Sequence, residues 1–275
     1  MEFNSSNKGQ SVFKNEEALT EDVHNPVLRN EEIQTIADSV RPLVRGNQPD
    51  NLLVHGDSGM GKTSCASYVL DELDRQTNVK TTIINCWHYN TRISLLTQLL
   101  IDLGYPAPRK GKPVDELVAK LREWLDKNDC VAVGLDELDQ LQHQNEVAYD
   151  LYRLSQEAEN CVGMVMISNQ PPSEVNLDPR SQSRLSFQML EFEPYSVEEL
   201  TEVLEKRAEK AFRDGAYDSE VIEYIAEKVA EEDSDCRRAL KILQRAGRRA
   251  DGNAVSAPDA ELFGAFRGLG VALLG

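Results

Sequence analysis

Hydrophobic and polar positions along this chain follow two periods in turn, one that fits strands and one that fits helices. From Asn30, EEIQTIADSV places its apolar residues on one helical face, whereas NLLVHG is a short apolar run that ends at a glycine. Strands that alternate with helices predict an α/β fold with a parallel sheet covered on both faces. The predicted strands are residues 51–56, 81–86, 130–135, 161–168 and 187–192. The predicted helices between them are residues 30–46, 63–73, 93–103, 114–125 and 145–157.

After Pro194 the strand pattern stops. Residues 196–213, 218–232 and 235–250 each carry helical periodicity, so a small all-helical domain is expected to follow the α/β domain. We therefore divide the chain into four parts. They are a flexible N-terminus (1–15), an α/β domain (16–194), a helical domain (195–250) and a tail (251–275).

Composition narrows the class of protein. The five cysteines of the 275 residues are scattered without a C-x-x-C pair, which argues against a zinc site or a disulfide framework. The first ten residues, MEFNSSNKGQ, lack the apolar core of a secretory signal, and no apolar run is long enough to span a bilayer. We expect a cytoplasmic protein without a membrane partner.

The net charge of -17 is unusual and has two interpretations. Nucleic-acid-binding proteins usually carry a basic excess, so the charge alone argues against a DNA role. Arginine outnumbers lysine by eighteen to twelve, and acidic, lysine-poor surfaces also keep proteins soluble in a high-salt cytoplasm.

The segment GDSGMGKT fits the phosphate-binding pattern G-x-x-x-x-G-K-[ST] at every fixed position, between a predicted strand and a predicted helix. Its glycines let backbone N–H groups surround an anion, and the helix N-terminus adds partial positive charge. Lys62 is expected to reach the outer phosphates of ATP or ADP, and the Thr63 hydroxyl to ligate Mg²⁺. The predicted nucleotide-binding residues are Gly56, Asp57, Ser58, Gly59, Met60, Gly61, Lys62, Thr63 and Ser64.

Two acids end the apolar run VAVGL. Asp136 is expected to hold Mg²⁺, and Glu137 to polarise the water that attacks the outer phosphate. An Asp-Glu pair is common on surfaces, but its place at the end of a buried strand makes it a strong signal. The sequence thus predicts an ATPase site with slow turnover.

Further polar residues are candidates for the same site. Asn169 ends the next predicted strand, where it can orient the water or simply cap the strand. Arg180 and Arg184, in LDPRSQSRL, are each either an arginine finger that reaches a neighbouring subunit's ATP or a surface arginine.

The last predicted helix is basic. Residues 237–249 hold six basic residues and no acid, whereas residues 191–235 hold sixteen acidic and five basic ones. Arg237 at its start can fold back onto the γ-phosphate. The stripe of Arg237, Lys241, Arg245 and Arg249 otherwise compensates the helix dipole and solvates the surface.

Taken in order, these motifs resemble the archaeal origin-recognition and cell-division-control family of replication initiators, which are AAA+ ATPases. The resemblance covers residues 11–247. The segments that carry it are SVFKNEEALTEDVHNPVLRNEEIQTIADSVRPLVRG, GDSGMGKTS, NCWHYNT, GLDELDQL, ISN, LDPRSQSRL and DCRRALKILQRAG.

The resemblance implies roles for particular residues. Arg29 and Ile33 fall where the family's nucleotide-base pocket lies, Asn169 at its first sensor and Arg237 at its second. Arg184, less surely Arg180, falls at the arginine finger, which implies self-association or assembly with full-length initiator paralogues. The family's additional helix, which touches DNA, would fall within residues 87–108.

The chain departs from the family in two places. Ser234 stands where the family usually has glycine, and the tail GNAVSAPDAELFGAFRGLGVALLG is too short for the family's C-terminal winged helix. Weak, sequence-indifferent duplex binding is therefore expected, with the replicative helicase as a further partner implied by the resemblance.

Three functions stay open at this point. The first is an initiator ATPase for chromosomal or plasmid DNA replication. The second is a regulatory ATP switch that assembles with full-length initiators without binding origins itself. The third is an AAA+ helper in transposition or repair, which the N-terminal segment and the order of the motifs disfavour.

Overall fold

The computed structural model describes residues 11–20, 26, 28–105, 112–178, 185, 187–250 and 254–264. They form two compact units. An α/β unit comprises residues 24–57 and 61–192, and a helical unit takes in the N-terminal segment, residues 58–60 and the residues from 193 onward.

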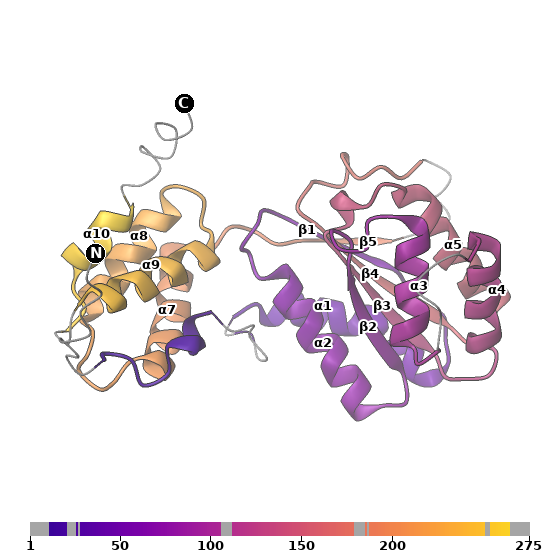
Figure 1. Ribbon diagram of the computed structural model, residues 1–275, viewed down its shortest axis with the longest axis horizontal. Coiled ribbons are helices and arrows are strands. Elements are labelled where there is room, and N and C mark those ends of the chain that lie inside the picture. The colour runs from indigo at the N-terminus through magenta and orange to yellow at the C-terminus, as the bar shows by residue number, and fades with distance from the viewer. Residues whose placement is uncertain are drawn as a thin grey trace, which may run out of the picture. The chain divides into compact units, whose positions relative to one another are not determined.

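The α/β unit is built on a five-stranded sheet whose order is β2-β3-β4-β1-β5 (Figure 1). All four strand pairs are parallel, as predicted. The pairing register places Asn85 opposite Asp136, and His55 between Ser168 and Glu191. The strands are β1 (Leu52–His55), β2 (Lys80–Asn85), β3 (Val131–Asp136), β4 (Val162–Ser168) and β5 (Gln188–Glu191).

Helices cover both faces of this sheet (Figure 1). On one face α3, α4 and α5 pack with the strands into a single large apolar core, and α1 and α2 cover the other face. These helices and the short 3₁₀ turns beside them are α1 (Asn30–Val40), η2 (Arg41–Arg45), α2 (Lys62–Gln76), α3 (Arg92–Asp102), α4 (Val114–Leu125), η3 (Leu138–Gln140) and α5 (Gln144–Glu157).

The middle of the sheet is buried on both sides. Every residue of β3 and β4 is buried, which explains why their sequences are continuous apolar runs rather than alternating ones. Gly134 sits in the centre of β3, where a Cβ would lie 2.8 Å from Cγ1 of Ile83 and 3.2 Å from Cδ1 of Leu70 on α2. The absence of a side chain at Gly134 therefore lets α2 pack directly on the sheet.

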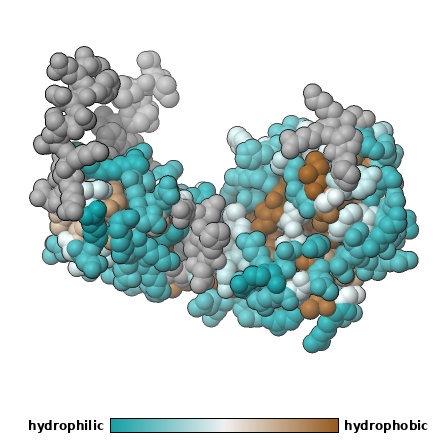
Figure 2. Space-filling model, turned by 60° about the horizontal axis from the view of Figure 1, so that its bottom comes forward, coloured by the Kyte–Doolittle hydropathy of each residue, from teal (hydrophilic) through white to brown (hydrophobic). Residues whose placement is uncertain are grey.

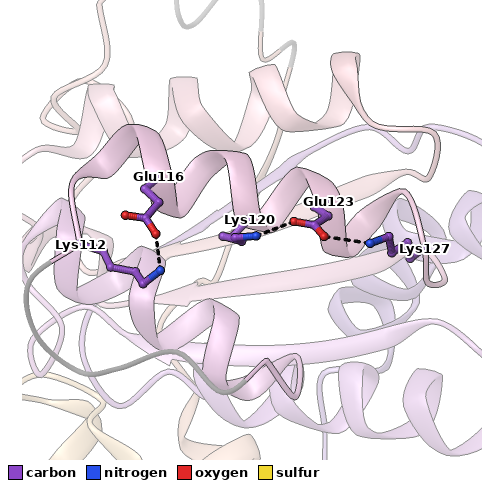
Figure 3. Close-up of polar contacts among 5 residues, drawn as sticks. All are labelled: Lys112, Glu116, Lys120, Glu123 and Lys127. Atoms are coloured by element: carbon purple, nitrogen blue, oxygen red, sulfur yellow. Dashed lines mark hydrogen bonds and ion pairs between the residues drawn. The ribbon is translucent and has the colours of Figure 1, made fainter.

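The surface of helix α4 carries a ladder of paired charges (Figure 3). Lys112 pairs with Glu116, and Glu123 accepts from Lys120 at 2.7 Å and from Lys127 at 2.8 Å. Pairs three or four residues apart lie on one side of a helix, and each stabilises it modestly. Most of the surface drawn in Figure 2 is hydrophilic, with hydrophobic patches on the α/β unit.

The helical unit packs its helices around an apolar core of its own. Its helices are η1 (Glu16–Leu19), α7 (Val197–Ala211), α8 (Ser219–Ala230), α9 (Cys236–Arg249) and α10 (Ala257–Gly264). Ser196 caps α7 through a reciprocal pair of hydrogen bonds with Glu199. Asp235 caps α9 by accepting from the backbone of Arg238 at 3.1 Å.

The expected boundaries need correction at both ends of the helical unit. Residues 11–15 were expected to be flexible, but Val12 and Phe13 are buried there, and the Phe13 ring lies 4.7 Å from that of Phe212. The Arg207 guanidinium also donates to the Ala18 carbonyl at 2.8 Å, so Glu16–Leu19 belongs with this unit. At the other end, α10 adds a helix beyond the expected limit at residue 250.

Across the ranges that the structure describes, no helix combines the length and the apolar character needed to cross a membrane.

Candidate nucleotide-binding site

Polar side chains gather at the carboxyl edge of the parallel sheet. β1 leads into the glycine-rich loop, β2 ends at Asn85, β3 at Asp136 and β4 at Ser168. In open parallel sheets this edge is where ligands bind, because loops and helix N-termini meet there. The predicted phosphate loop and the predicted acids lie on this edge together.

The loop after β1 has the backbone conformation that its glycines predict. Gly56 has φ +141°, and a Cβ there would lie 2.5 Å from the Phe192 carbonyl oxygen, so only glycine fits. Gly61, at φ 91°, caps the N-terminus of α2, whose backbone N–H groups are then available to an anion. Asp57 and Ser58 are exposed on this loop.

Lys62 is almost buried, at 5% exposure, in the first turn of α2. Its amine donates to the carbonyl oxygens of Gly56 at 2.7 Å and Asp57 at 2.6 Å. The amine is therefore held over the loop, where phosphate oxygens can replace these carbonyls as acceptors. Ser64 follows in the same helix and is half-buried.

Thr63 and Asp136 meet across the sheet edge. The Thr63 hydroxyl donates to Oδ1 of Asp136 at 2.9 Å, and Asp136 is 8% exposed. A hydroxyl and a carboxylate in contact at a phosphate loop are suitable oxygen ligands for Mg²⁺, which usually takes only one or two ligands from the protein and the rest from phosphates and water. The two residues predicted as metal ligands thus fit a Mg²⁺ ion.

Glu137 lies next to Asp136 with a left-handed backbone (φ 54°). Its Oε2 accepts a hydrogen bond from Nδ2 of Asn85 at 3.0 Å. Oδ1 of Asn85 in turn accepts from the backbone N–H groups of Trp87 and His88, at 3.0 and 3.1 Å. One amide therefore joins the Glu137 carboxylate to the turn after β2.

Asn85 was not among the predicted site residues. The signal that would have found it is its position, because a polar residue that ends one strand of a parallel sheet lies beside the residue that ends the next. Register pairing places Asn85 directly opposite Asp136.

Asn169 follows β4 at the same edge and is exposed. Its backbone N–H donates to Oδ1 of Asp139 at 3.0 Å. Asp139 belongs to η3, the turn that begins after Glu137, so one carboxylate ties the ends of β3 and β4 together. Asn169 is held near the acids by this link.

The buried thiol of Cys86 lies close to the negatively charged carboxylates at this edge. Burial raises the pKa of Cys86 to about 12, and the carboxylates of Asp136, Asp139 and Glu137 add to the shift. The three carboxylates disfavour the negatively charged thiolate because like charges repel. The same negative charge favours a cation bound at this edge.

Arg29 and Ile33, the predicted base-pocket residues, lie at the start of α1. Arg29 is 9% exposed, adopts a left-handed backbone and pairs with Glu32 at 2.9 Å. Its guanidinium lies 5.5 Å from the centre of the Phe192 ring, a cation–π contact. Ile33 lines an apolar groove of about 330 Å³ between α1 and α2, together with Tyr68.

The remaining predicted residues are not brought to this edge within the α/β unit. Arg180 and Arg184 lie outside the described residues. Arg237 is exposed in the first turn of α9, in the helical unit. Just before α9, Ser234 has φ 52°, a conformation that favours glycine.

Two stretches of the chain match models of known domains. Residues 45–171 match an AAA domain. Residues 201–257 match a Cdc6 AAA+ ATPase-type lid domain. The two matches fall on the α/β unit and on the helical unit.

Relatives with curated names extend the similarity along the chain. It is 34% identical over 253 residues to ORC1-type DNA replication protein 1 of Methanosarcina acetivorans, a match that covers 88% of this chain and 61% of the relative. It is 35% identical over 259 residues to the ORC1-type DNA replication protein of Pyrococcus furiosus, covering 89% and 62%. The chain thus spans about three fifths of the length of these relatives.

Solved structures show the same architecture. The structure of the Aeropyrum pernix ORC1 protein in complex with DNA has a TM-score of 0.81 and 30% identity, and the match covers 91% of this chain and 69% of that one. The crystal structure of Cdc6p from Pyrobaculum aerophilum also has a TM-score of 0.81, at 21% identity, covering 90% and 70%. The second match shows a shared fold only.

Proposed function

This chain belongs to the Orc1/Cdc6 family of AAA+ ATPases, and we propose that it binds ATP with Mg²⁺ and acts in the initiation of DNA replication. The observation that carries the proposal is the contact between Thr63 and Asp136 beside the loop that holds Lys62. A hydroxyl, a carboxylate and an amine at one helix N-terminus are the groups that a Mg²⁺-nucleotide needs.

Each residue then has a task that its position supports. The Lys62 amine exchanges the Gly56 and Asp57 carbonyls for phosphate oxygens. Thr63 and Asp136 hold Mg²⁺, which supplies charge neutralisation on the phosphates when it is bound.

Glu137 accepts a proton from the attacking water, and Asn85 orients the Glu137 carboxylate through the 3.0 Å hydrogen bond. Asn169 completes the edge as a group that positions the water. Arg237 of the helical unit and Arg184 of a second subunit are the proposed sources of positive charge toward the γ-phosphate.

The role in replication follows from family membership and is tested separately from nucleotide binding. Equilibrium binding of a fluorescent ATP analogue, with and without Mg²⁺, tests the site. Chromatin immunoprecipitation of the chain, with and without its full-length relatives present, tests enrichment at replication origins. If the chain binds nucleotide but is not enriched at replication origins, the nucleotide site stands and the proposed role in initiation is wrong.

A further inference from the structure

The solvent side of α9 is basic in a protein that is otherwise strongly acidic. Arg237, Lys241, Arg245, Arg248 and Arg249 are all exposed, and together they are called the α9 basic face. The opposite side of the helix is buried against the helical unit through Ala239, Leu243 and Ala246. Twelve residue steps make this face about 18 Å long.

Helix stability does not account for this face. Cations favour the C-terminal end of a helix, so the helix dipole suits Arg248 and Arg249. Arg237 begins the helix, where the dipole disfavours a cation, and the first turn of α9 holds no acid. By contrast, α7 carries Glu198 and Glu199 in its first turn and α8 carries Glu220.

Pairing does not account for it either. On α4 and the residues that flank it, Lys112, Lys120 and Lys127 are each paired with a glutamate of α4 (Figure 3). On the α9 basic face Arg248 pairs with Glu16, but Lys241 and Arg249 form no ion pair with any residue in the described ranges. A chain with 17 excess negative charges thus keeps five cations on one side of a helix whose own sequence from Arg237 to Arg249 contains no acid.

The chemistry of the face selects one class of partner. The apolar side chains of α9, among them Leu240, Ile242 and Leu243, are buried, so within this helix none lies beside the cations to anchor a protein interface. Four of its five residues are arginines, whose planar guanidinium binds phosphate oxygens in bidentate geometry. Cations recur at 237, 241, 245 and 249, about one every 6 Å along one side of the helix, which suits a linear array of phosphates.

We propose that the α9 basic face binds the sugar-phosphate backbone of duplex DNA without reading its sequence. The proposal rests on the role in replication given above and adds a DNA contact surface located in the helical unit. Backbone contacts of this kind release counterions, so the affinity falls with salt in proportion to the number of phosphates that are neutralised.

The test compares two triple variants of the 275-residue chain that lose the same charge. Lys241→Gln, Arg245→Gln and Arg249→Gln neutralise the α9 basic face but leave Arg237 for its proposed nucleotide role. Lys112→Gln, Lys120→Gln and Lys127→Gln, called the α4 triple variant, remove three positive charges from α4 and its flanking residues. Fluorescence anisotropy of a labelled 30-base-pair duplex of random sequence is measured from low to moderate KCl.

The first of these, the α9 triple variant, is expected to bind the duplex more than about tenfold more weakly than the wild type at 0.1 M KCl. The magnitude of its slope of log K against log[KCl] should be smaller by about 2.7, since each of the three contacts removed contributes about 0.9. The α4 triple variant is expected to keep the wild-type slope. An equal loss of duplex affinity in both variants would mean that only net charge matters. Unchanged duplex affinity in the α9 triple variant would mean that the α9 basic face does not bind DNA. Either result overturns the proposal.

Two further measurements separate the remaining outcomes. Binding of labelled poly-glutamate as tight as that of the duplex, and equally sensitive to the α9 triple variant, would assign the face to an acidic protein and overturn the proposal. A wild-type chain that binds the ATP analogue but no duplex would overturn the DNA surface while leaving the proposed nucleotide site intact. Retained ATP-analogue binding by the α9 variant, alongside lost duplex binding, supports it.

Discussion

Thr63 and Asp136 lie 73 residues apart in the sequence, yet the hydroxyl of one donates a 2.9 Å hydrogen bond to the carboxylate of the other. The contact joins the first turn of α2 to the end of β3. It brings together the two residues that the phosphate-loop pattern and the acidic strand end predicted separately as ligands of Mg²⁺. The predictions below start from this edge of the sheet.

Lys62→Ala is expected to weaken ATP binding by more than about 100-fold, because the outer phosphates lose a charged donor whose hydrogen bonds each contribute about 1.5–3 kcal/mol. Titration with a fluorescent ATP analogue measures the loss. Lys80→Ala, an exposed lysine at the amino edge of the sheet, is the matched control and should bind normally. Wild-type affinity in Lys62→Ala would contradict the phosphate-loop assignment.

Glu137→Gln is expected to bind Mg²⁺-ATP within about threefold of the wild type and to slow turnover by about 10²–10⁴-fold, the usual contribution of a general base. Asp136 and Thr63 remain in place for the metal. Single-turnover hydrolysis of radiolabelled ATP separates the chemical step from binding. A variant that hydrolyses at the wild-type rate would remove Glu137 from the reaction.

Asn85→Asp tests the link between β2 and the Glu137 carboxylate. Aspartate keeps an oxygen for the N–H groups of Trp87 and His88 but replaces the Nδ2 donor with a second carboxylate facing Glu137. We expect turnover to fall by about tenfold or more, because like charges at this distance turn the Glu137 carboxylate away or protonate it.

The control for this variant is Asn90→Ala, in the segment between Asn85 and α3, whose side chain makes no hydrogen bond to Glu137 among the described contacts. ATP affinity should stay unchanged in both variants. If turnover in Asn85→Asp were faster than in the wild type, the hydrogen bond from Asn85 would hold Glu137 back rather than orient it.

Ser234→Gly should stabilise the helical unit. Ser234 adopts φ 52°, which costs a residue with a side chain about 1–2 kcal/mol, and part of the relief is offset by the greater freedom of glycine in the unfolded chain. We expect a net gain of about 0.5–1 kcal/mol in urea unfolding. Ser234→Ala keeps the strain and should give no such gain.

The stability of the chain should rise with salt. Its 17 excess negative charges repel one another, and the screening length shrinks from about 10 Å at 0.1 M to about 3 Å at 1 M ionic strength. Thermal melts across KCl concentrations into the molar range should show a steep increase in Tm. Sucrose of equal osmolality is the control for effects other than screening, and a flat response to KCl would contradict the interpretation of the acidic surface as an adaptation to high salt.

Local pattern was sufficient to predict most of the elements and to propose most of the candidate site. The helix predicted at residues 114–125 has these bounds in the structure, and the strand predicted at 161–168 is β4, which begins one residue later. Periodicity and glycine positions are local properties, so they could be read directly from the sequence. Lys62, Thr63 and Asp136 were proposed as site residues in the same way, because their motifs are short.

Contacts between distant segments could not be predicted in this way. The N-terminal segment looks polar, but its Phe13 packs against the ring of Phe212. Phe13 also contacts Gly247, which lies 234 residues after it, and a side chain at Gly247 would collide with the Phe13 ring. Asn85 was likewise missed because its partner is 52 residues away on another strand. Both depend on which strands and helices become neighbours. The end of a strand can be read from the sequence, as at Asn85, but the strand that lies beside it cannot.

Gly134 makes the nucleotide edge sensitive to a change in the buried interior of the sheet. Alanine is one base substitution away from glycine, yet its methyl group would meet Ile83 and Leu70 at less than normal contact distance. The closer contact, 2.8 Å, is with Ile83 of β2, the strand that ends at Asn85, and the second is with Leu70 of α2, the helix that begins with Lys62 and Thr63. Residue 134 therefore links the packing inside the sheet to the position of the candidate ATP-binding residues, although it carries no functional group of its own.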